Sequence, residues 1–302
     1  RCMANDTSSS NQLERTRTSS RVTFVDDSGL RPLRARPRFS DYLRQIWKIR
    51  HYVQQDARGK SFSVGRGTFL GTAWIILNPA IQVSLYAFVF GLLLRADRGV
   101  DNFIGFLIIG VIFFAFINQG FSNGSMLIQR NRGLLTSFNF PKAAVVLSAA
   151  LRLTLDNIAP AMLAVIGALI FQPTHTPSWT VVLVIPIFVL THVMAAGFSF
   201  IFARLTAFIP DVNSLIQILT RILFFVSGVF APVTRFVEHP GILRILEANP
   251  AYQVLDMTRT VVLSGQVPSI GRWAYLAAIS ISLFVLGLIF FWKAEHRYAS
   301  VK

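Results

Sequence analysis

Residues 56–90 read DARGKSFSVGRGTFLGTAWIILNPAIQVSLYAFVF, and this stretch decides the fold. A basic, glycine-punctuated run gives way to an apolar segment, which predicts a membrane span because a bilayer core takes about 20 apolar residues per helix. Polar and aromatic side chains recur at every fourth position and therefore lie near one face of that helix. This first-span stripe consists of Trp74, Asn78, Gln82, Tyr86 and Phe90. A helix that contacted only lipid would have no use for such a stripe.

The composition is that of a membrane protein with several spans. The 302 residues are 53% hydrophobic and only 14% charged, whereas soluble domains carry about 25% charged residues. The net charge of +15 is concentrated before the first span, where residues 1–70 hold 14 basic and 6 acidic residues. We interpret this surplus as an anchor on anionic lipid rather than a nucleic-acid site, because no nucleic-acid fold pattern accompanies it. A single cysteine and five scattered histidines exclude an intrachain disulfide and give no metal-site spacing.

The apolar runs predict an all-α polytopic membrane protein with six transmembrane helices in residues 71–292. The spans are expected at residues 71–94, 102–128, 143–171, 179–208, 212–230 and 273–292. Residues 1–37 are predicted to be a disordered cytoplasmic tail, and residues 293–302 a second cytoplasmic tail. Residues 38–70 predict an amphipathic N-terminal interfacial helix and a hinge, with a soluble helix that packs on a partner as the alternative. The apolar segment 231–272 predicts short external re-entrant helices, which need a backbone buried in protein.

The charges of the loops predict the orientation. Six spans place both termini on one side, and the termini and the loop between the second and third spans are basic. The first–second and third–fourth loops are neutral. The positive-inside rule therefore predicts cytoplasmic termini and a multi-pass protein of the bacterial inner (plasma) membrane.

Four motifs follow one another over roughly residues 40–295. They are Asp56 with Gly71, Trp74 and Asn78-Pro79; NRGLLTSFNFP at 131–141; Asp211 with LFFVSGVFAPV at 223–233; and Asn249-Pro250. Together they resemble the motifs of ABC-2-type transporter permeases, and within that family most of all the polysaccharide exporters of the O-antigen and teichoic-acid type. The abundance of arginine suggests an actinobacterial member, such as a galactan exporter. The sequence departs from the family pattern at Gln55 and Pro210, where arginine is usual, and at Gly228, where proline is usual.

The resemblance implies a homodimeric permease that works with two copies of an ABC ATPase subunit. It implies no catalytic residue and no cofactor in this chain, because ATP and Mg would be bound by the partner subunit. The residues agree with this expectation. Gly59-Lys60-Ser61 looks like the end of a phosphate-binding loop, but Gln54 stands in place of its first glycine and no strand precedes it. The implied substrate is a lipid-linked cell-envelope polysaccharide.

The loop between the second and third spans is the predicted contact with the ATPase. It is short and basic, ends at a proline, and carries apolar side chains that fit a groove in the way amphipathic helices do. The candidate coupling residues are Arg130, Arg132, Leu134, Leu135 and Phe138. The alternative is an ordinary basic inner loop.

A second stripe on the fifth span gives the first-span stripe a candidate partner. Its members are Asn213, Gln217, Arg221, Phe224 and Gly228. We hypothesise that the two stripes line a channel between protomers, because aromatic faces stack on sugars and amides hydrogen-bond to hydroxyls. The predicted channel residues are Trp74, Asn78, Gln82, Tyr86, Phe90, Asn213, Gln217 and Phe224. The alternative for the aromatic residues is core packing.

Three charged residues fall within the predicted spans, where a central arginine costs about 2.5–3.5 kcal/mol. Arg152 and Asp156 are four residues apart and can pair along their helix, and Arg221 is expected at a similar depth. One hypothesis is a site for the pyrophosphate of a lipid-linked glycan, since arginine suits phosphate. The other is a structural ion pair or triad.

Two rival functions remain open from the sequence. One is an exporter of drugs or small lipids from the same family. The other is a polytopic membrane enzyme acting on polyprenyl-phosphate sugars, which would need acidic or histidine clusters at a membrane face. The second–third loop contains no acidic residue, which argues against the enzyme.

Overall fold

The computed structural model describes residues 38–61, 71–93, 102–137, 140–172, 178–230 and 240–300. Within these ranges the chain is helical, with short connections and no strand. The predicted N-terminal tail, residues 62–70 of the predicted hinge and the coupling residue Phe138 lie outside them. The chain divides into a unit of residues 1–35 and a unit of residues 36–302, and all that follows concerns the second unit.

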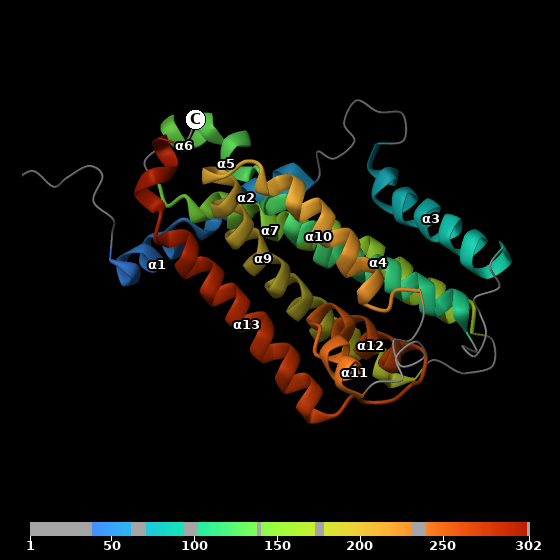
Figure 1. The fold of residues 1–302 in the computed structure, drawn as a ribbon. Coiled ribbons are helices and arrows are strands. Elements are labelled where there is room, and N and C mark those ends of the chain that lie inside the picture. Colours follow the sequence, from blue (N-terminus) through green and yellow to red (C-terminus); the bar gives the residue numbers. More distant parts are fainter. Residues whose placement is uncertain are drawn as a thin grey trace, which may run out of the picture. The chain divides into compact units, whose positions relative to one another are not determined.

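Thirteen α-helices occur in the described ranges (Figure 1). They are α1 (Phe39–Lys48), α2 (Arg50–Ser61), α3 (Trp74–Tyr86), α4 (Phe103–Gly124), α5 (Leu127–Arg130), α6 (Arg132–Ser137), α7 (Ala143–Asp156), α8 (Ile158–Ile170), α9 (Val184–Phe208), α10 (Val212–Val226), α11 (Pro240–Glu247), α12 (Pro250–Val262) and α13 (Ile270–Trp292). Segments of 3-10 helix cover Gly71–Ala73, Trp179–Leu183 and Glu295–Ser300, and a π-helical segment, Ala87–Leu93, continues α3.

Five helical segments of the described chain are long and apolar enough to cross a membrane. They are Trp74–Gly91, Phe103–Gly124, Ala143–Ile170, Trp179–Phe208 and Ile270–Trp292. The prediction of an all-helical polytopic membrane protein is therefore confirmed. The remaining predicted span corresponds to α10, an apolar helix of 15 residues. Its length of about 22 Å is less than the bilayer core of about 30 Å.

The predicted fifth span was wrong at its end, because α10 ends at Val226 rather than at residue 230. Gly228 has φ +68°, the left-handed conformation that commonly stops a helix and that glycine adopts at least cost. The carbonyl groups of Gly228 and Val229 then accept hydrogen bonds from Arg259 of α12, at 2.9 Å each. The chain after α10 is thus fixed by a helix that follows it in sequence.

Arg259 joins three elements in the interior. Only 5% of its surface is exposed. Besides the two carbonyl groups after α10, its guanidinium donates to the carbonyl oxygen of Phe106 on α4 and lies 3.3 Å from the centroid of the Phe106 ring. A buried positive charge is tolerated only when its N–H groups find acceptors, as they do here. Arg259 therefore holds α12 against α4 and the end of α10.

Close helix packing forms the centre of the bundle. A side chain at Gly124 of α4 would place its Cβ 2.5 Å from the carbonyl oxygen of Ser199 on α9. A Cβ at Gly287 of α13 would likewise lie 2.5 Å from the carbonyl oxygen of Gly197. Only glycine permits such contacts, so Gly124 and Gly287 serve the close packing of α4 and α13 on α9.

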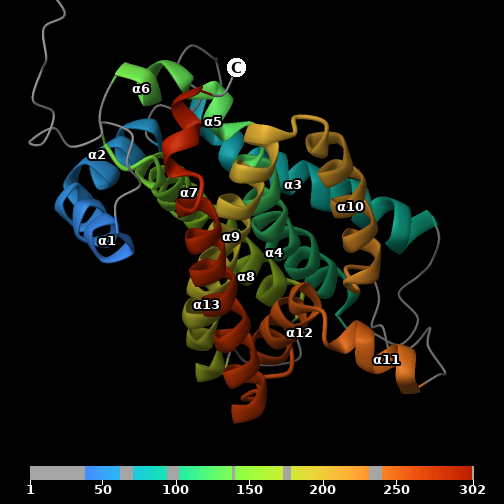
Figure 2. The same ribbon diagram turned by 60° about the vertical axis from the view of Figure 1, so that its left-hand side comes forward.

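The two ends of this bundle carry different elements. Figures 1 and 2 both show α5, α6 and the C-terminal 3-10 helix at one end and α11 with α12 at the other. The predicted short helices of segment 231–272 are thus present as α11 and α12. Most of α12 is buried, and it packs against α4 and α9.

A buried carboxylate organises the end that carries α5 and α6. Glu295 Oε1 accepts the backbone N–H of Lys142 at 2.7 Å, and Glu295 Oε2 accepts the Tyr42 hydroxyl at 2.7 Å. The Tyr42 hydroxyl accepts the N–H of Ala143 at 3.2 Å. Burial raises the pKa of the Glu295 carboxyl, and the hydrogen bonds from Lys142 and Tyr42 act in the opposite direction. This Tyr42–Glu295 cap joins α1, the C-terminal segment and the start of α7.

We expect Glu295→Ala to lower the stability of the purified protein by about 2 kcal/mol or more. The variant removes a helix cap and leaves a buried hydroxyl and a backbone N–H without an acceptor. The melting temperature measures the effect, with size-exclusion chromatography of heated samples as the readout of the folded fraction. Glu295→Gln, which keeps an acceptor oxygen, should lose less. The neighbouring exposed variant His296→Ala is the control, and an equal melting temperature for Glu295→Ala and this control would contradict the assignment.

Candidate functional site

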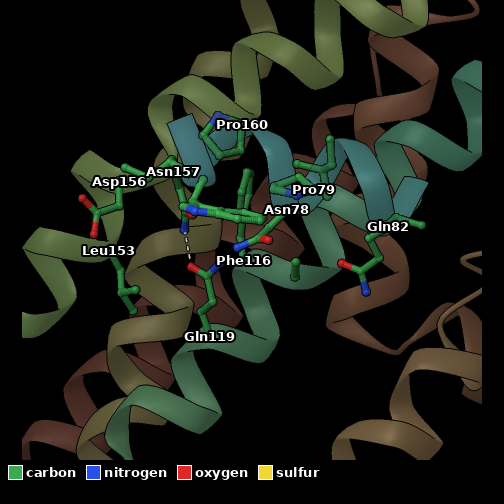
Figure 3. A pocket seen from close by; sticks show the side chains of 14 residues that line it. Asn78, Pro79, Gln82, Phe116, Gln119, Leu153, Asp156, Asn157 and Pro160 are labelled. Atoms are coloured by element: carbon green, nitrogen blue, oxygen red, sulfur yellow. Dashed lines mark hydrogen bonds between the residues drawn. The ribbon is translucent and has the colours of Figure 1, made fainter. Parts of the chain in front are cut away.

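A pocket of about 300 Å³ lies between α3, α4 and the junction of α7 with α8 (Figure 3). The first-span stripe contributes Trp74, Asn78 and Gln82 to its wall. The other polar and aromatic side chains come from α4 and from the α7–α8 junction. They are Phe116, Gln119, Asp156 and Asn157. The remaining lining residues are Ile75, Pro79, Val111, Ile112, Ala115, Leu153 and Pro160. We call this the stripe pocket.

Two prolines shape the backbone around the stripe pocket. Pro79 lies inside α3, and Pro160 lies in the first turn of α8, after the break at Asn157. Proline has no N–H, so neither residue can donate to the carbonyl group four positions earlier. Those carbonyl groups belong to Ile75 and Asp156, and both residues line the pocket. The regular helical hydrogen-bond pattern is therefore interrupted on both sides of the pocket, in α3 and at the α7–α8 junction.

A buried hydrogen-bond network supports the wall formed by Asn157. This side chain is 3% exposed, and its amide donates to Gln119 Oε1 at 2.7 Å and to His192 Nε2 at 3.0 Å. His192 Nδ1 lies 2.9 Å from the carbonyl oxygen of Phe188, which can only accept, so Nδ1 carries the hydrogen. Three helices, α4, α8 and α9, meet through this network at the α7–α8 break.

The charged pair at the rim is present as the sequence predicted. Arg152 Nε lies 3.3 Å from Asp156 Oδ2. The other carboxylate oxygen of Asp156 accepts the hydroxyl of Ser61, the last residue of α2. Asp56 of α2 binds Ser148 of α7 in the same way. The polar helix α2 thus lies along α7 and reaches the pocket rim.

The predicted charge triad is not assembled. Arg221 is exposed on α10, and no hydrogen bond or ion pair in the described ranges joins it to Arg152 or Asp156. Because Asp156 contacts the polar end of α2, the Arg152–Asp156 pair lies beside a polar segment rather than among apolar helices alone. The structure therefore supports the pair and provides no shared site for the three charges.

The outer part of the first-span stripe has a different environment from the inner part. The ring of Tyr86 lies 5.8 Å from that of Phe224 and 5.3 Å from that of Phe230, between centroids. The ring of Phe90 stacks on Phe230 at 4.0 Å. The two predicted stripes therefore meet in an aromatic cluster. Within the single chain these rings pack against one another, as the alternative interpretation of core packing describes.

The inner residues of the second stripe lie apart from the stripe pocket. Asn213 is half-buried and its side-chain oxygen accepts the Ser125 hydroxyl at 2.7 Å. Gln217 is exposed on α10. Neither residue lines the stripe pocket, so the structure does not bring all eight predicted channel residues together.

The predicted coupling loop forms the short helices α5 and α6. Arg130 and Arg132 are exposed, and Leu134 is half-buried. Leu135 is only 2% exposed and packs in the same core as Tyr42 and Tyr298. In this structure the chain's own core buries Leu135, so its side chain is not offered at the surface, and the role of the loop in coupling stays a prediction.

Sequence reasoning missed Gln119, Asn157 and Pro160, which form the far wall of the pocket. Each is a polar residue or a proline within an otherwise apolar predicted span. Such interruptions are a usable signal, because a polar side chain within a span needs a partner. Within the described ranges no three His, Cys, Asp or Glu side chains cluster closely enough to hold a metal ion.

A family model described as ABC-2 type transporter matches residues 60–263, which is more than half of the chain. The chain belongs to the ABC-2 type transporter family. The resemblance drawn from the four motifs is thereby confirmed, and so is the prediction of a transport permease rather than an enzyme.

Curated relatives of this ABC-2 permease point to one group within the family. The O-antigen export system permease protein RfbA of Myxococcus xanthus is 24% identical over 236 residues, covering 78% of this chain and 88% of the relative. The protein of the same name from Klebsiella pneumoniae is 22% identical over 240 residues, covering 78% and 89%. The polysialic acid transport protein KpsM of Escherichia coli is 24% identical over 235 residues, covering 75% and 86%.

We expect Asn157→Leu to destabilise this permease by about 1–3 kcal/mol, because Gln119 and His192 would keep buried polar atoms without a partner. A lowered melting temperature of the purified protein is the readout. Gln217→Leu is the matched control, since it removes an exposed amide on α10. Equal melting temperatures for the two variants would show that the network contributes nothing.

Proposed function

We propose that this chain is the transmembrane subunit of an ATP-driven exporter that moves a lipid-linked cell-envelope polysaccharide out of the cytoplasm across the inner membrane. The observation that carries the proposal is the placement of Trp74, Asn78 and Gln82, which line a pocket with both polar and apolar walls in a family of transport permeases. The names of the relatives, for O-antigen export and polysialic acid transport, favour a polysaccharide over a drug or a small lipid.

The proposed topology has six spans, with α10 as the fifth, and cytoplasmic termini. The elements at the α5–α6 end then face the cytoplasm, and α11 with α12 form the external re-entrant segment. Helix α1 supports an inner-leaflet position for the N-terminal helices. It exposes Leu43 and 69% of Trp47, and Arg50 lies 5.1 Å from the Trp47 ring centroid. Apolar side chains beside basic ones are typical of interfacial helices on anionic lipid.

The proposed assembly is a homodimer with two ABC ATPase subunits that bind ATP and Mg. Helix α10 supports a second copy of the chain. It exposes Gln217 and Arg221, four residues apart on one face, and an arginine facing lipid costs about 2.5–3.5 kcal/mol near the bilayer centre. In a dimer, Arg221 would face a polar pathway between the two copies instead of lipid, and this cost would not arise. The exposed arginines of α5 and α6 support an ATPase contact at the opposite surface from α11.

We expect Asn78→Leu combined with Gln82→Leu to lower export severalfold while the permease still accumulates in the membrane. The change removes the amides that face the pocket and leaves the apolar packing of α3 in place. Export is measured as the ratio of surface glycan to lipid-linked glycan retained inside the cell. Ile76→Ala, at an exposed position on the opposite face of α3, is the control. Normal export in the double variant would show that the stripe pocket is not part of the export pathway.

We expect Arg130→Glu to reduce co-purification of the ATPase subunit about tenfold, since each 1.4 kcal/mol of lost affinity is a factor of ten. Arg130 is exposed at the α5–α6 end. The control is Arg244→Glu, the same charge reversal at an exposed position on α11 at the other end. Equal loss in both variants would point to a general effect of charge and against a contact at α5.

A further inference from the structure

The stripe pocket offers hydrogen-bonding groups that the protein leaves unused. Asn78 and Gln82 are exposed amides on its wall, and within the described ranges neither makes a hydrogen bond. Each amide can donate and accept. Pro79 and Pro160, which also line the pocket, bring no backbone N–H of their own to it. Unused polar groups in a membrane span are costly, so an occupant with its own donors and acceptors is expected.

The charge of the pocket selects against an anion. Among the described residues that line it, Asp156 is the one ionisable side chain. Both carboxylate oxygens of Asp156 are occupied, one by Arg152 at 3.3 Å and the other by Ser61. The Arg152–Asp156 pair is neutral overall, and Arg152 itself does not line the pocket. A phosphate group would find no free cation among the lining residues.

One aromatic side chain of the pocket is accessible to a ring with C–H faces. Trp74 is 37% exposed at the pocket wall, whereas Phe116 on the α4 wall is only 1% exposed. A volume of about 300 Å³ is at the lower limit of small-molecule sites, which measure roughly 300–1,000 Å³. The combination of two unpaired amides and an exposed indole matches a hydroxylated ring rather than an acyl chain.

The position of the pocket places it within reach of a lipid-linked headgroup. At its rim, Asp156 accepts a hydrogen bond from Ser61, the last residue of the polar helix α2, which precedes the first span. Since α2 is polar and basic, this rim lies at the level where a bilayer changes from headgroups to acyl chains. A sugar attached to a lipid carrier in the same leaflet lies at that level too.

We propose that the stripe pocket binds a neutral sugar ring of the exported glycan within a single protomer, by stacking on Trp74 and by hydrogen bonds to Asn78 and Gln82. This inference rests on the proposed export function and names what the site recognises. It assigns the pocket to a hydroxylated ring and not to the pyrophosphate of the carrier. It also places the site between α3, α4 and α7, apart from the face of α10 that carries Gln217.

The test is protection of a cysteine placed in the pocket. Cys2 is the only native cysteine, so a Cys2→Ser background with Ala115→Cys provides a single reporter on the α4 wall. The full-length protein in lipid nanodiscs is alkylated with N-ethylmaleimide in the presence of hexyl β-maltoside or hexyl phosphate. A bound probe slows alkylation by 1 + [L]/Kd, which is about fourfold at three times the dissociation constant.

We expect hexyl β-maltoside to protect the reporter and hexyl phosphate to leave it unprotected. Trp74→Leu and Gln82→Leu should each abolish the protection. Trp179→Leu, at a tryptophan with 69% exposure outside the pocket, should retain it. These variants distinguish binding in the pocket from a general effect of the glycoside on the bilayer.

Several outcomes overturn the proposal. Protection by hexyl phosphate alone would assign the pocket to a charged headgroup, and equal protection by both probes would assign it to the hexyl chain. Protection that survives in Trp74→Leu and Gln82→Leu would place the glycoside elsewhere. If neither Ala115→Cys nor a second reporter, Ile75→Cys, reacts at all, the pocket is too closed for a sugar. Failure of the export function appears separately, as normal surface glycan in cells depleted of this chain.

Discussion

The start of α7 is fixed by the carboxylate of Glu295, and the wall of the stripe pocket depends on that helix. Glu295 and Tyr42 together accept the first two backbone N–H groups of the segment, at Lys142 and Ala143. Both side chains are almost fully buried, so these hydrogen bonds hold the start of α7 against α1 and the C-terminal segment away from competing water. Helix α7 then carries Asp156 to the pocket rim. Through α7, the buried carboxylate of Glu295 therefore connects the α5–α6 end, where we propose the ATPase contact, with the stripe pocket, where we propose the substrate site.

Helix α2 repeats this arrangement along the length of α7. Asp56 binds Ser148, and Ser61 binds Asp156, so the two helices are joined at two positions beyond the Tyr42–Glu295 cap. This explains why an acidic residue precedes the first span in a strongly basic segment. Each contact is a partly buried, charge-assisted hydrogen bond, so α2 is joined to α7 both near the middle of α7 and at its end.

The sequence was sufficient for features that depend on neighbours along the chain. Apolar runs gave the long helices, and four-residue spacing gave both the stripe and the Arg152–Asp156 pair. It was insufficient where the partner lies far away in sequence. Tyr42 and Glu295 are 253 positions apart, and the early end of α10 depends on Arg259 as well as on Gly228. Leu135 looked like a free apolar residue because the core that buries it comes from distant helices.

The first-span stripe is divided between two neighbours, and this division bears on how an exporter of this type works. Its inner residues face the stripe pocket within the protomer, whereas Tyr86 and Phe90 contact the aromatic rings at the end of α10. Both sets belong to one helical segment, which contains Pro79 and continues as a π-helical segment, two features associated with bends at functional sites. Pro79 itself lines the stripe pocket, and the aromatic contact with α10 lies further along the same segment. Because helices bend most readily at proline, Pro79 both shapes the backbone at the pocket and sets the direction in which the segment reaches α10.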